Sequence, residues 1–234
     1  MISAILFDLD GTLLPMDQEK FLEAYLGGLA KKMVPYGYDP DLLVKSIWKG
    51  TGAMVMNDGR SRNDSVFWDT FSRIYGKDVR KDEPVFEDFY RNEFQSVSSA
   101  CGFDRRAAEI IVELKKMGKR LVLATNPLFP AIATHSRTSW AGLDPTDFEY
   151  ITTYENSCHC KPNPDYYREI LGKLNLKAEE CLMVGNDVGE DMIAETLGMK
   201  VFLLTDCLIN KQNVSIELYP HGSFPELLTF IRSL

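Results

Sequence analysis

Oxygen-bearing side chains gather in one short stretch of this chain. The segment "LMVGNDVGEDM" opens with an apolar run and then places Asn186, Asp187, Glu190 and Asp191 close together. Carboxylate and amide oxygens at this density suit a hard cation such as Mg²⁺. Asp187 and Glu190 also have the spacing of a helix capping box, which satisfies free N–H groups at a helix start. Capping explains two acids and leaves Asp191 and the Asn186–Asp187 pair without a role.

Polar side chains follow other apolar runs in the same way. They are Asp8 and Asp10 in "AILFDLDG", Thr125 and Asn126 in "RLVLATNP", Lys161 after "YITTYE", and Asp187 and Asp191 after "CLMVG". In an open α/β sheet, ligands bind beyond the carboxyl ends of the strands. We therefore expect these side chains to meet at one edge of a sheet.

The elements that must position these residues are short apolar strands. The five runs are "AILFDLDG", "RLVLATNP", "YITTYE", "CLMVGND" and "KVFLLTD", and they do not alternate apolar with polar residues. Such runs are typical of strands buried on both faces of a parallel sheet. From Asp104 onward they alternate with amphipathic patterns such as "DRRAAEIIVELKKMGKR", "NPDYYREILGKLNL" and "EDMIAETLGMK". The pattern predicts an α/β fold with a doubly wound, Rossmann-like parallel sheet.

The residues between the first two strands have a different pattern of apolar and polar side chains. Four segments read as amphipathic helices with aromatic stripes, namely "DQEKFLEAYLGGLAKKMV", "PDLLVKSIWKGTGAMVM", "SVFWDTFSRIYG" and "PVFEDFYRNEFQSV". No buried-strand run interrupts them. We therefore predict a helical domain over residues 16–99, inserted into an α/β core domain formed by residues 1–15 and 100–234.

Four motifs together resemble those of the haloacid dehalogenase-like (HAD) hydrolase superfamily. "ILFDLDGTLL" is similar to its nucleophile motif, "LVLATNP" to its Thr/Ser motif, "CKPNPDYY" to its Lys motif and "MVGNDVGED" to its acidic motif, in the family's order. The resemblance implies a phosphatase that acts on small phosphorylated metabolites. It also implies that the helical insert is a cap over the active site.

The resemblance assigns roles to the first two aspartates. Asp8 would be the nucleophile that forms an aspartyl-phosphate, and as an ionised carboxylate it needs no activating base. Asp10 would protonate the leaving alcohol and then accept a proton from the attacking water.

The resemblance further implies a bound Mg²⁺. Two unit charges about 4 Å apart interact by roughly 4 kcal/mol at an effective dielectric near 20, so carboxylates beside a phosphate dianion require a cation. The implied ligands are the Asp8 side chain, the Asp10 backbone carbonyl and an acid of the fourth motif. Lys161 would neutralise phosphoryl charge and steady Asp8. Thr125, with neighbouring groups that include Asn126, would bind the phosphoryl oxygens.

The acidic motif departs from the family pattern, because Asn186 stands between Gly185 and the next aspartate. Two alignments of the motif remain open. Either Asp187 is the metal ligand with Asp191 behind it, or Asn186 takes the ligand position. We favour Asp187, since an anionic ligand offsets the charge of the cation, and we expect Asp191 to hold Lys161 or a metal-bound water.

Arginines in the helical insert are further candidates. The loop "NDGRSRNDS" carries Arg60 and Arg62, and such a loop between helices can reach a substrate under a cap. We favour the alternative, a solvated loop with incidental charge.

Composition narrows the class of protein. The chain has a net charge of −8 and contains no Lys/Arg-rich block, so we expect no nucleic-acid partner. No apolar run approaches the roughly 20 residues of a membrane helix, and "MISAILF" lacks the features of a signal peptide. Five scattered cysteines favour the reducing cytoplasm over a disulfide framework. The sequence does not define an oligomeric state.

Two other functions compete with a Mg²⁺-dependent phosphatase. A sugar phosphomutase of the β-phosphoglucomutase type would retain the phosphoryl group instead of releasing it. A non-catalytic member that binds a metal or a partner is the alternative from another class. Dehalogenation and phosphonate hydrolysis are disfavoured, because Asp10 supplies an acid/base group that only phosphate-ester chemistry needs.

Overall fold

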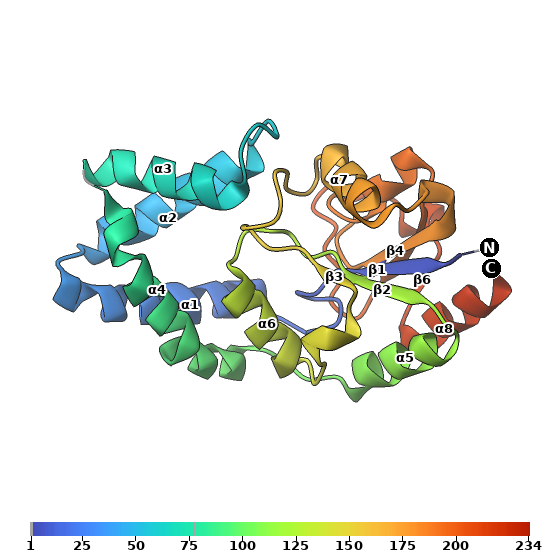
Figure 1. Cartoon of the computed structure of the whole chain (residues 1–234). Coiled ribbons are helices and arrows are strands. Elements are labelled where there is room, and N and C mark those ends of the chain that lie inside the picture. Colours follow the sequence, from blue (N-terminus) through green and yellow to red (C-terminus); the bar gives the residue numbers. More distant parts are fainter. Residues whose placement is uncertain (1, 77) are drawn as a thin grey trace.

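A six-stranded parallel sheet forms the centre of the computed structural model, which describes residues 2–76 and 78–234 (Figure 1). Its strands are β1 (Ala4–Phe7), β2 (Arg120–Leu123), β3 (Tyr150–Ile151), β4 (Cys181–Gly185), β5 (Lys200–Leu204) and β6 (His221–Gly222). The strand order is β3-β2-β1-β4-β5-β6, and every neighbouring pair is parallel. The order changes direction at β1, where sheets of this kind bind their ligands. The predicted α/β, Rossmann-like fold is confirmed.

Both faces of the sheet are covered by helices. Successive side chains of a strand point to opposite faces, so Ile5 and Phe7 enter one apolar cluster while Ala4 and Leu6 enter another. The helices that cover the first face are α5 (Arg105–Lys116) and α8 (Phe224–Ser233). Those on the second face are α7 (Pro164–Leu174) and the 3-10 helix η6 (Met192–Leu197). Burial on both faces explains why the strands read as continuous apolar runs.

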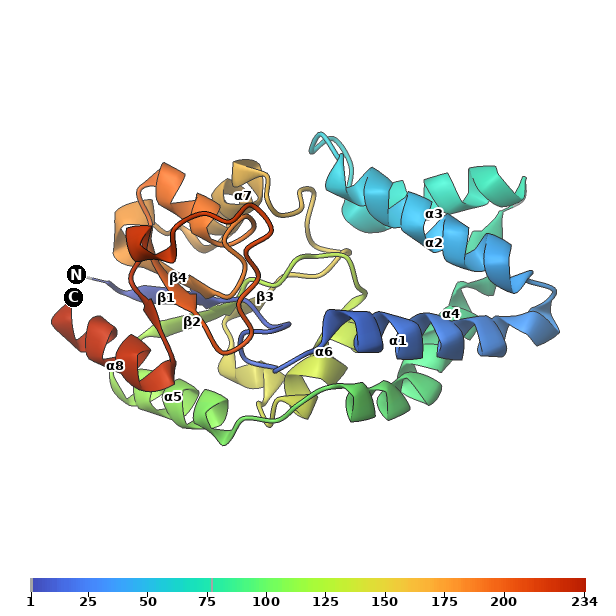
Figure 2. The same cartoon turned by 180° about the vertical axis from the view of Figure 1, so that it is seen from behind.

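The part of the chain from α1 to η3, between β1 and α5, forms a separate helical lobe (Figures 1 and 2). Its elements are α1 (Gln18–Met33), η1 (Val34–Tyr36), α2 (Pro40–Val55), α3 (Asn63–Tyr75), η2 (Val79–Asp82), α4 (Glu83–Arg91) and η3 (Glu93–Ala100). The aromatic stripes predicted to pack do so, and Phe71, Phe89 and Phe94 are fully buried among them. This lobe therefore has its own apolar cluster, which Ala133 of the α/β layer joins at one side.

The chain leaves and re-enters the α/β layer at one place. Met16 and Cys101 form an isolated antiparallel bridge, and the Gly102 N–H donates to the Pro15 carbonyl at 2.7 Å. The two connectors of the helical lobe consequently run side by side.

A loop of the helical lobe also docks on the α/β layer. The backbone N–H of Asn63 donates to the Ser157 carbonyl at 2.9 Å, and its side-chain amide donates to the His159 carbonyl at 3.3 Å. Asn63 is fully buried by these contacts. They fall on the loop that leads into Lys161.

Three elements differ from the sequence prediction. Helix α6 (Ala131–Trp140) and the two-residue strand β6 were not predicted. The segment "EDMIAETLGMK" forms the 3-10 helix η6 instead of an α-helix, and Gly198 is its C-cap. The remaining short 3-10 helices are η4 (Pro145–Asp147), η5 (Ala178–Glu180) and η7 (Ile216–Leu218). None of the helices in the described ranges is long and apolar enough to cross a membrane.

Candidate active site

Two carboxylates share one buried ammonium group at the carboxyl edge of the sheet. Lys161 Nζ lies 2.9 Å from Asp8 Oδ1 and 2.7 Å from Asp191 Oδ1. Strands β1 and β4 are neighbours in register, with Phe7 opposite Val184, so the residues that follow them meet. Asp191 is 1% exposed, and burial raises its pKa to about 7 although Lys161 opposes the shift. Burial alone would lower the pKa of Lys161, but Asp191 and Asp8 raise it.

The second oxygen of Asp8 faces Thr12. The Thr12 hydroxyl lies 3.1 Å from Asp8 Oδ2 and 3.0 Å from Asn186 Oδ1, so it donates to one of them at a time. The turn before Thr12 requires glycine, because Gly11 has a φ of +88° and a Cβ there would lie 2.3 Å from Asn186 Nδ2. Asn186 therefore packs directly behind the turn that carries the two first-strand aspartates.

Asp10 is held by a different cation, which the sequence interpretation missed. The guanidinium of Arg137, on α6, pairs with Asp10 Oδ2 and lies 4.4 Å from the centre of the Phe129 ring. Burial raises the pKa of Asp10, Arg137 opposes that shift, and the Asp8 carboxylate adds to it. Asp10 Oδ1 is shielded from solvent and has no hydrogen-bond partner in the described part of the chain. That oxygen is free to meet a reacting group.

Arg137 escaped the sequence interpretation because α6 gives a weak signal. The helix begins after Pro130, spans only ten residues and mixes Ala, Thr and Ser with its apolar residues. The residue itself stands out in the structure, since it is 1% exposed and arginine is almost never fully buried without a partner. A buried arginine cannot be told from an exposed one without the helix register.

The residues after β2 form hydrogen bonds with residues of the Lys motif and of the acidic motif. Thr125 is buried, and its backbone carbonyl accepts from the hydroxyls of Thr152 at 2.6 Å and Tyr166 at 2.9 Å. Asn126 Nδ2 donates to Glu190 Oε2 at 3.0 Å, and Asn126 Oδ1 accepts from the Lys161 N–H at 3.3 Å. The predicted gathering of Thr125, Asn126 and Lys161 beside Asp8 is therefore present.

In the acidic motif, Asp187 caps the following turn without Glu190, whereas the sequence suggested that both residues form a capping box. Asp187 Oδ1 accepts from the N–H groups of Gly189 at 2.7 Å and Glu190 at 3.0 Å, so Asp187 caps the turn. The Glu190 carboxylate turns away from the cap and accepts from Asn126. The expectation that Glu190 is a capping residue is wrong, because its long side chain reaches the site. Asp191 Oδ2 accepts from the Asp187 N–H at 3.0 Å, which fixes the carboxylate that holds Lys161.

Negative charge exceeds positive charge around Asp8. Burial raises the pKa of Glu190, Lys161 opposes the shift, and Asp187 and Asp8 add to it. Within residues 2–76 and 78–234, no three Asp, Glu, His or Cys side chains converge as a complete metal cluster by themselves. A hard cation at this edge would accordingly draw part of its coordination from backbone carbonyls, waters and substrate oxygens.

The arginine candidates of the helical lobe lie elsewhere. Arg60 is largely exposed and pairs with Asp58, while Arg62 pairs with Asp64 at 3.1 Å. Neither arginine lines the cavity that contains Asp8 and Asp10. The structure therefore does not bring Arg60 and Arg62 to the site, and their loop packs against His159 at Gly59.

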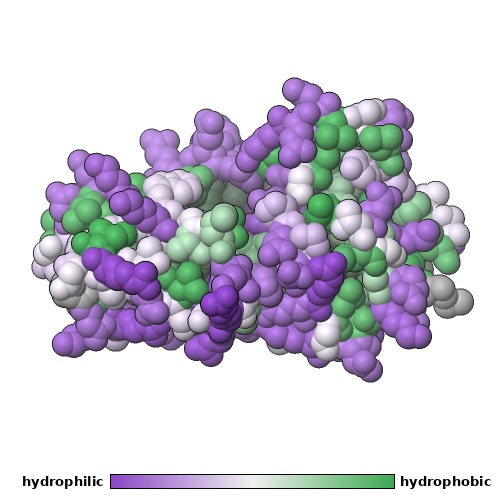
Figure 3. All heavy atoms as spheres, turned by 90° about the horizontal axis from the view of Figure 1, so that it is seen from above, coloured by the Kyte–Doolittle hydropathy of each residue, from purple (hydrophilic) through white to green (hydrophobic). Residues whose placement is uncertain are grey.

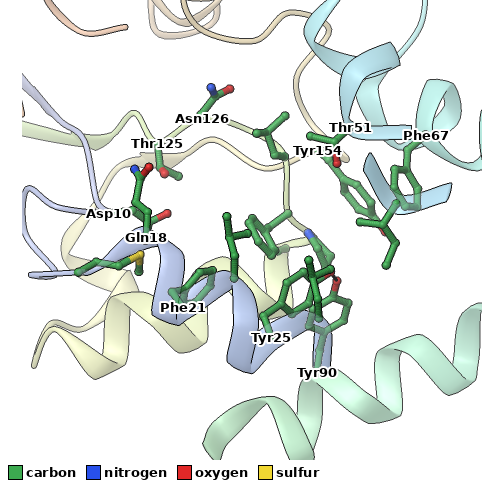
Figure 4. Close-up of a pocket in the computed structure, with 18 of the residues that line it drawn as sticks. Asp10, Gln18, Phe21, Tyr25, Thr51, Phe67, Tyr90, Thr125, Asn126 and Tyr154 are labelled. Carbon is green, nitrogen blue, oxygen red and sulfur yellow. Dashed lines mark hydrogen bonds between the residues drawn. The ribbon is translucent and has the colours of Figure 1, made fainter. Parts of the chain in front are cut away.

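A cavity of about 520 Å³ extends from the sheet edge into the helical lobe. Asp10 and Thr125 lie at one end, and Phe67 and Tyr154 lie at the other (Figure 4). From above, a hollow between the lobe and the α/β layer is visible, with both hydrophilic and hydrophobic residues around its rim (Figure 3). The carboxylates at the sheet edge thus face an enclosed space.

Comparisons with known proteins agree with this arrangement. A family model for haloacid dehalogenase-like hydrolases matches residues 2–194. A phosphoglycolate phosphatase of Colwellia psychrerythraea is 26% identical over 86% of this chain and 83% of its own length. A glyceraldehyde 3-phosphate phosphatase of Methanocaldococcus jannaschii is 27% identical over 100% of this chain and 99% of its own. The crystal structure of a HAD phosphatase from Thermococcus onnurineus superposes with a TM-score of 0.61 at 18% identity, covering 98% of both chains.

The family model spans most of the chain and includes each of the four motifs that meet at Asp8. The structural similarity independently supports the same fold. This chain is a hydrolytic enzyme and belongs to the haloacid dehalogenase-like hydrolases.

Proposed function

We propose that this enzyme is a Mg²⁺-dependent phosphatase of small phosphorylated metabolites that acts through an aspartyl-phosphate on Asp8. The observation that carries the proposal is the division of two neighbouring aspartates between two buried cations. Asp8 is paired with Lys161, and Asp10 is paired with Arg137. Carboxylates in different environments take different roles in catalysis.

Asp8 is suited to attack phosphorus. Lys161 and the Thr12 hydroxyl hold its two oxygens, so the carboxylate is fixed at the end of β1. In the first step, an Asp8 oxygen forms a bond to phosphorus while the bond from phosphorus to the ester oxygen breaks. The Asp10 carboxyl gives its proton to the departing alkoxide.

Asp10 then acts as the base of the second step. Its carboxylate accepts a proton from a water whose oxygen attacks the phosphorus. The bond between phosphorus and Asp8 breaks, which releases inorganic phosphate and restores the Asp8 carboxylate. The raised pKa of Asp10 suits a group that must carry a proton in one step and release it in the next.

Mg²⁺ fits the chemistry of the residues at the sheet edge. The residues that would hold it are Asp8 through its side chain, Asp10 through its backbone carbonyl and Asp187 through its carboxylate. Burial raises the pKa of Glu190, and the nearby Asp187 and Asp8 carboxylates add to that rise, so a cation is favoured here. When bound, Mg²⁺ would offset the charge of the phosphoryl group and of the attacking carboxylate.

The phosphoryl oxygens would be bound by Lys161, Thr125 and Asn126. Lys161 already bridges two carboxylates, and Thr125 and Asn126 both line the cavity. Residues 16–99 would serve as the cap that excludes water during the reaction. All five cysteines are unpaired, which suits a reducing compartment such as the cytoplasm.

A panel of phosphomonoesters tests the proposal. We expect Mg²⁺-dependent release of inorganic phosphate that is lost in Asp8→Asn and strongly reduced in Asp10→Asn. A phosphomutase would instead convert a hexose 1-phosphate to its 6-phosphate. A protein that releases phosphate from no ester, generic chromogenic esters included, would make the non-catalytic alternative correct.

A further inference from the structure

We propose that the preferred substrate is a phosphate monoester of an apolar alcohol, with an alkyl or aryl leaving group that fills the cavity under the helical lobe. This inference rests on the proposed phosphatase function and narrows its substrate class. It starts from the side chains that line the cavity beyond Asp10.

The wall from the helical lobe is mostly apolar, with Gln18, Thr51 and Glu83 as polar members beside Glu87 and Arg91. Helix α1 turns one face to the cavity, with residues three and four positions apart. These residues are Phe21, Leu22, Tyr25, Leu26 and Leu29. Ile47 and Trp48 of α2, Phe67 and Trp68 of α3, and Phe86 of α4 continue the wall.

The wall from the α/β layer has the same character. Leu128, Phe129 and Ile132 line the cavity from the segment that leads into α6, and Tyr154 lies at its far end. Glu155 also reaches the cavity, but both its oxygens accept from the Ala131 N–H, at 2.9 and 3.0 Å. That carboxylate is therefore occupied as the cap of α6.

Two tyrosine hydroxyls in the wall share one hydrogen bond. Tyr25 and Tyr90 are both buried, and their hydroxyl oxygens lie 2.8 Å apart. Their rings are stacked with centroids 6.2 Å apart (Figure 4). Because one hydroxyl donates to the other, the pair retains a single O–H and consists mainly of aromatic surface.

Size and polarity together disfavour a small polar leaving group. Cavities of roughly 300 to 1,000 Å³ enclose whole drug-sized ligands, and this one measures about 520 Å³. The glycolate or glyceraldehyde part of a small ester would leave most of that space unfilled. A sugar would lose water from its hydroxyls and would gain few partners from walls made mostly of Leu, Ile and Phe side chains. An apolar chain gains from burial against the same walls.

Rim residues are compatible with entry of such a chain. Trp48 is 49% exposed at the rim, so an apolar contact is available before the cavity is entered. The Glu87 and Arg91 side chains pair with each other at 3.5 Å on α4, also among the lining residues. Gln18, Glu87 and Arg91 are exposed to solvent, while Thr51 and Glu83 are half-buried members of the wall.

A homologous series of alkyl phosphates tests the inference. Ethyl, butyl, hexyl and octyl phosphate have leaving groups of similar intrinsic reactivity, so differences in kcat/KM report binding of the chain. We expect kcat/KM to rise by about fourfold per methylene until the cavity is filled. We also expect hexyl phosphate to exceed glucose 6-phosphate, which has the same number of carbons.

Substitutions in the cavity wall provide the second arm. Leu26→Gln and Trp48→Gln are expected to lower the ratio of octyl to ethyl phosphate efficiency by at least tenfold. Leu42→Gln is the matched control, because Leu42 is a partly exposed leucine of α2 outside the cavity and its substitution should leave the ratio unchanged. Thermal unfolding of each variant establishes that it is folded.

The outcomes separate the two proposals. If all esters are hydrolysed with the same efficiency, or if the wall variants keep the chain-length preference, the inference is wrong and the phosphatase function stands. If no ester is hydrolysed, the phosphatase function is wrong and the inference falls with it.

Discussion

At the scale of single residues, the site depends on which cation each carboxylate meets. Asp8, Lys161 and Asp191 form one buried set, and Asp10 and Arg137 form another. The first set follows from motifs near strand ends, whose approach to one another a parallel sheet guarantees. The contact with Arg137 depends on the rotation of one short helix, which no local pattern specifies.

Removal of Arg137 is expected to impair catalysis more than binding. In Arg137→Met, Asp10 loses the partner that orients its carboxylate, so kcat should fall by roughly tenfold to a hundredfold while KM changes little. Arg137→Lys, which retains a positive charge, should recover part of the loss. Steady-state kinetics on the best ester checks this, with circular dichroism to establish folding. An Arg137→Met protein with normal kcat would show that Asp10 needs no such support.

The ligand in the acidic motif is also decided by single residues. Asn186 lies behind the Gly11 turn and shares the Thr12 hydroxyl with Asp8, whereas Asp187 uses one oxygen as a cap and keeps its charge for a cation. We expect Asp187→Asn to raise the Mg²⁺ concentration for half-maximal activity by roughly tenfold or more. Asp206→Asn, at an exposed carboxylate, is the control. Unchanged Mg²⁺ dependence in Asp187→Asn would assign the ligand position to Asn186.

At the scale of elements, the sequence predicts a strand or helix correctly where burial produces a recognisable run or spacing of apolar residues. The five predicted strands are present, and in β1, β2, β4 and β5 burial selects continuous apolar residues. Strand β3 is a half-buried edge strand of two residues. Strand β6 was missed because His221 and Gly222 form no apolar run, and η6 differs because hydrophobic spacing does not separate a 3-10 turn from a short α-helix. The boundaries of helices with a clear cap were the easiest to place.

Helix α5 offers a test of capping. Asp104 accepts from the Arg106 N–H at 2.9 Å and pairs with the Arg106 side chain, which lowers the pKa of Asp104. We expect Asp104→Ala to lower the free energy of unfolding by about 1 kcal/mol at neutral pH. A lowered folded-state pKa gives stability above the unfolded-state pKa that is lost as the pH falls through the folded value. The difference in free energy of unfolding between the unchanged protein and Asp104→Ala should therefore become smaller at acid pH.

Asp104→Asn is the matched variant for this test, because an amide oxygen still caps the helix but does not titrate in this range. Urea denaturation at neutral and acid pH measures all three proteins. An Asp104→Ala difference that stays constant with pH would contradict a charged cap.

At the scale of the whole molecule, two lobes with separate apolar clusters enclose the cavity between them. The sequence predicted the helical segment and its place in the chain. It did not predict the apolar cavity, because the aromatic residues that line it read as ordinary helix packing. An aromatic side chain of the helical lobe can either pack in the core or line the cavity. Which of the two it does depends on how α1 to α4 are placed relative to α6.

Motion of the helical lobe can be tested at its connectors. Met16 and Cys101 form an antiparallel bridge, whose Cα separation of about 4.5 to 5.5 Å suits a disulfide. Met16→Cys should therefore join the connectors when oxidised. If the lobe must open for product to leave, oxidation should lower kcat severalfold and a reductant should restore it. The same substitution combined with Cys101→Ser is the control. Equal turnover in both redox states would place the motion elsewhere.

The pairing of the connectors also affects how the chain folds. Strands β1 and β2 are neighbours in the sheet but are separated in sequence by the entire helical segment. When that segment forms first, its ends at Pro15 and Gly102 meet, and the loop that remains between the strands is short. Shortening a loop about fourfold lowers its closure cost by roughly 1 kcal/mol. We therefore expect the helices to gain protection from hydrogen exchange before the central strands do, so that the insertion guides the pairing of β1 with β2.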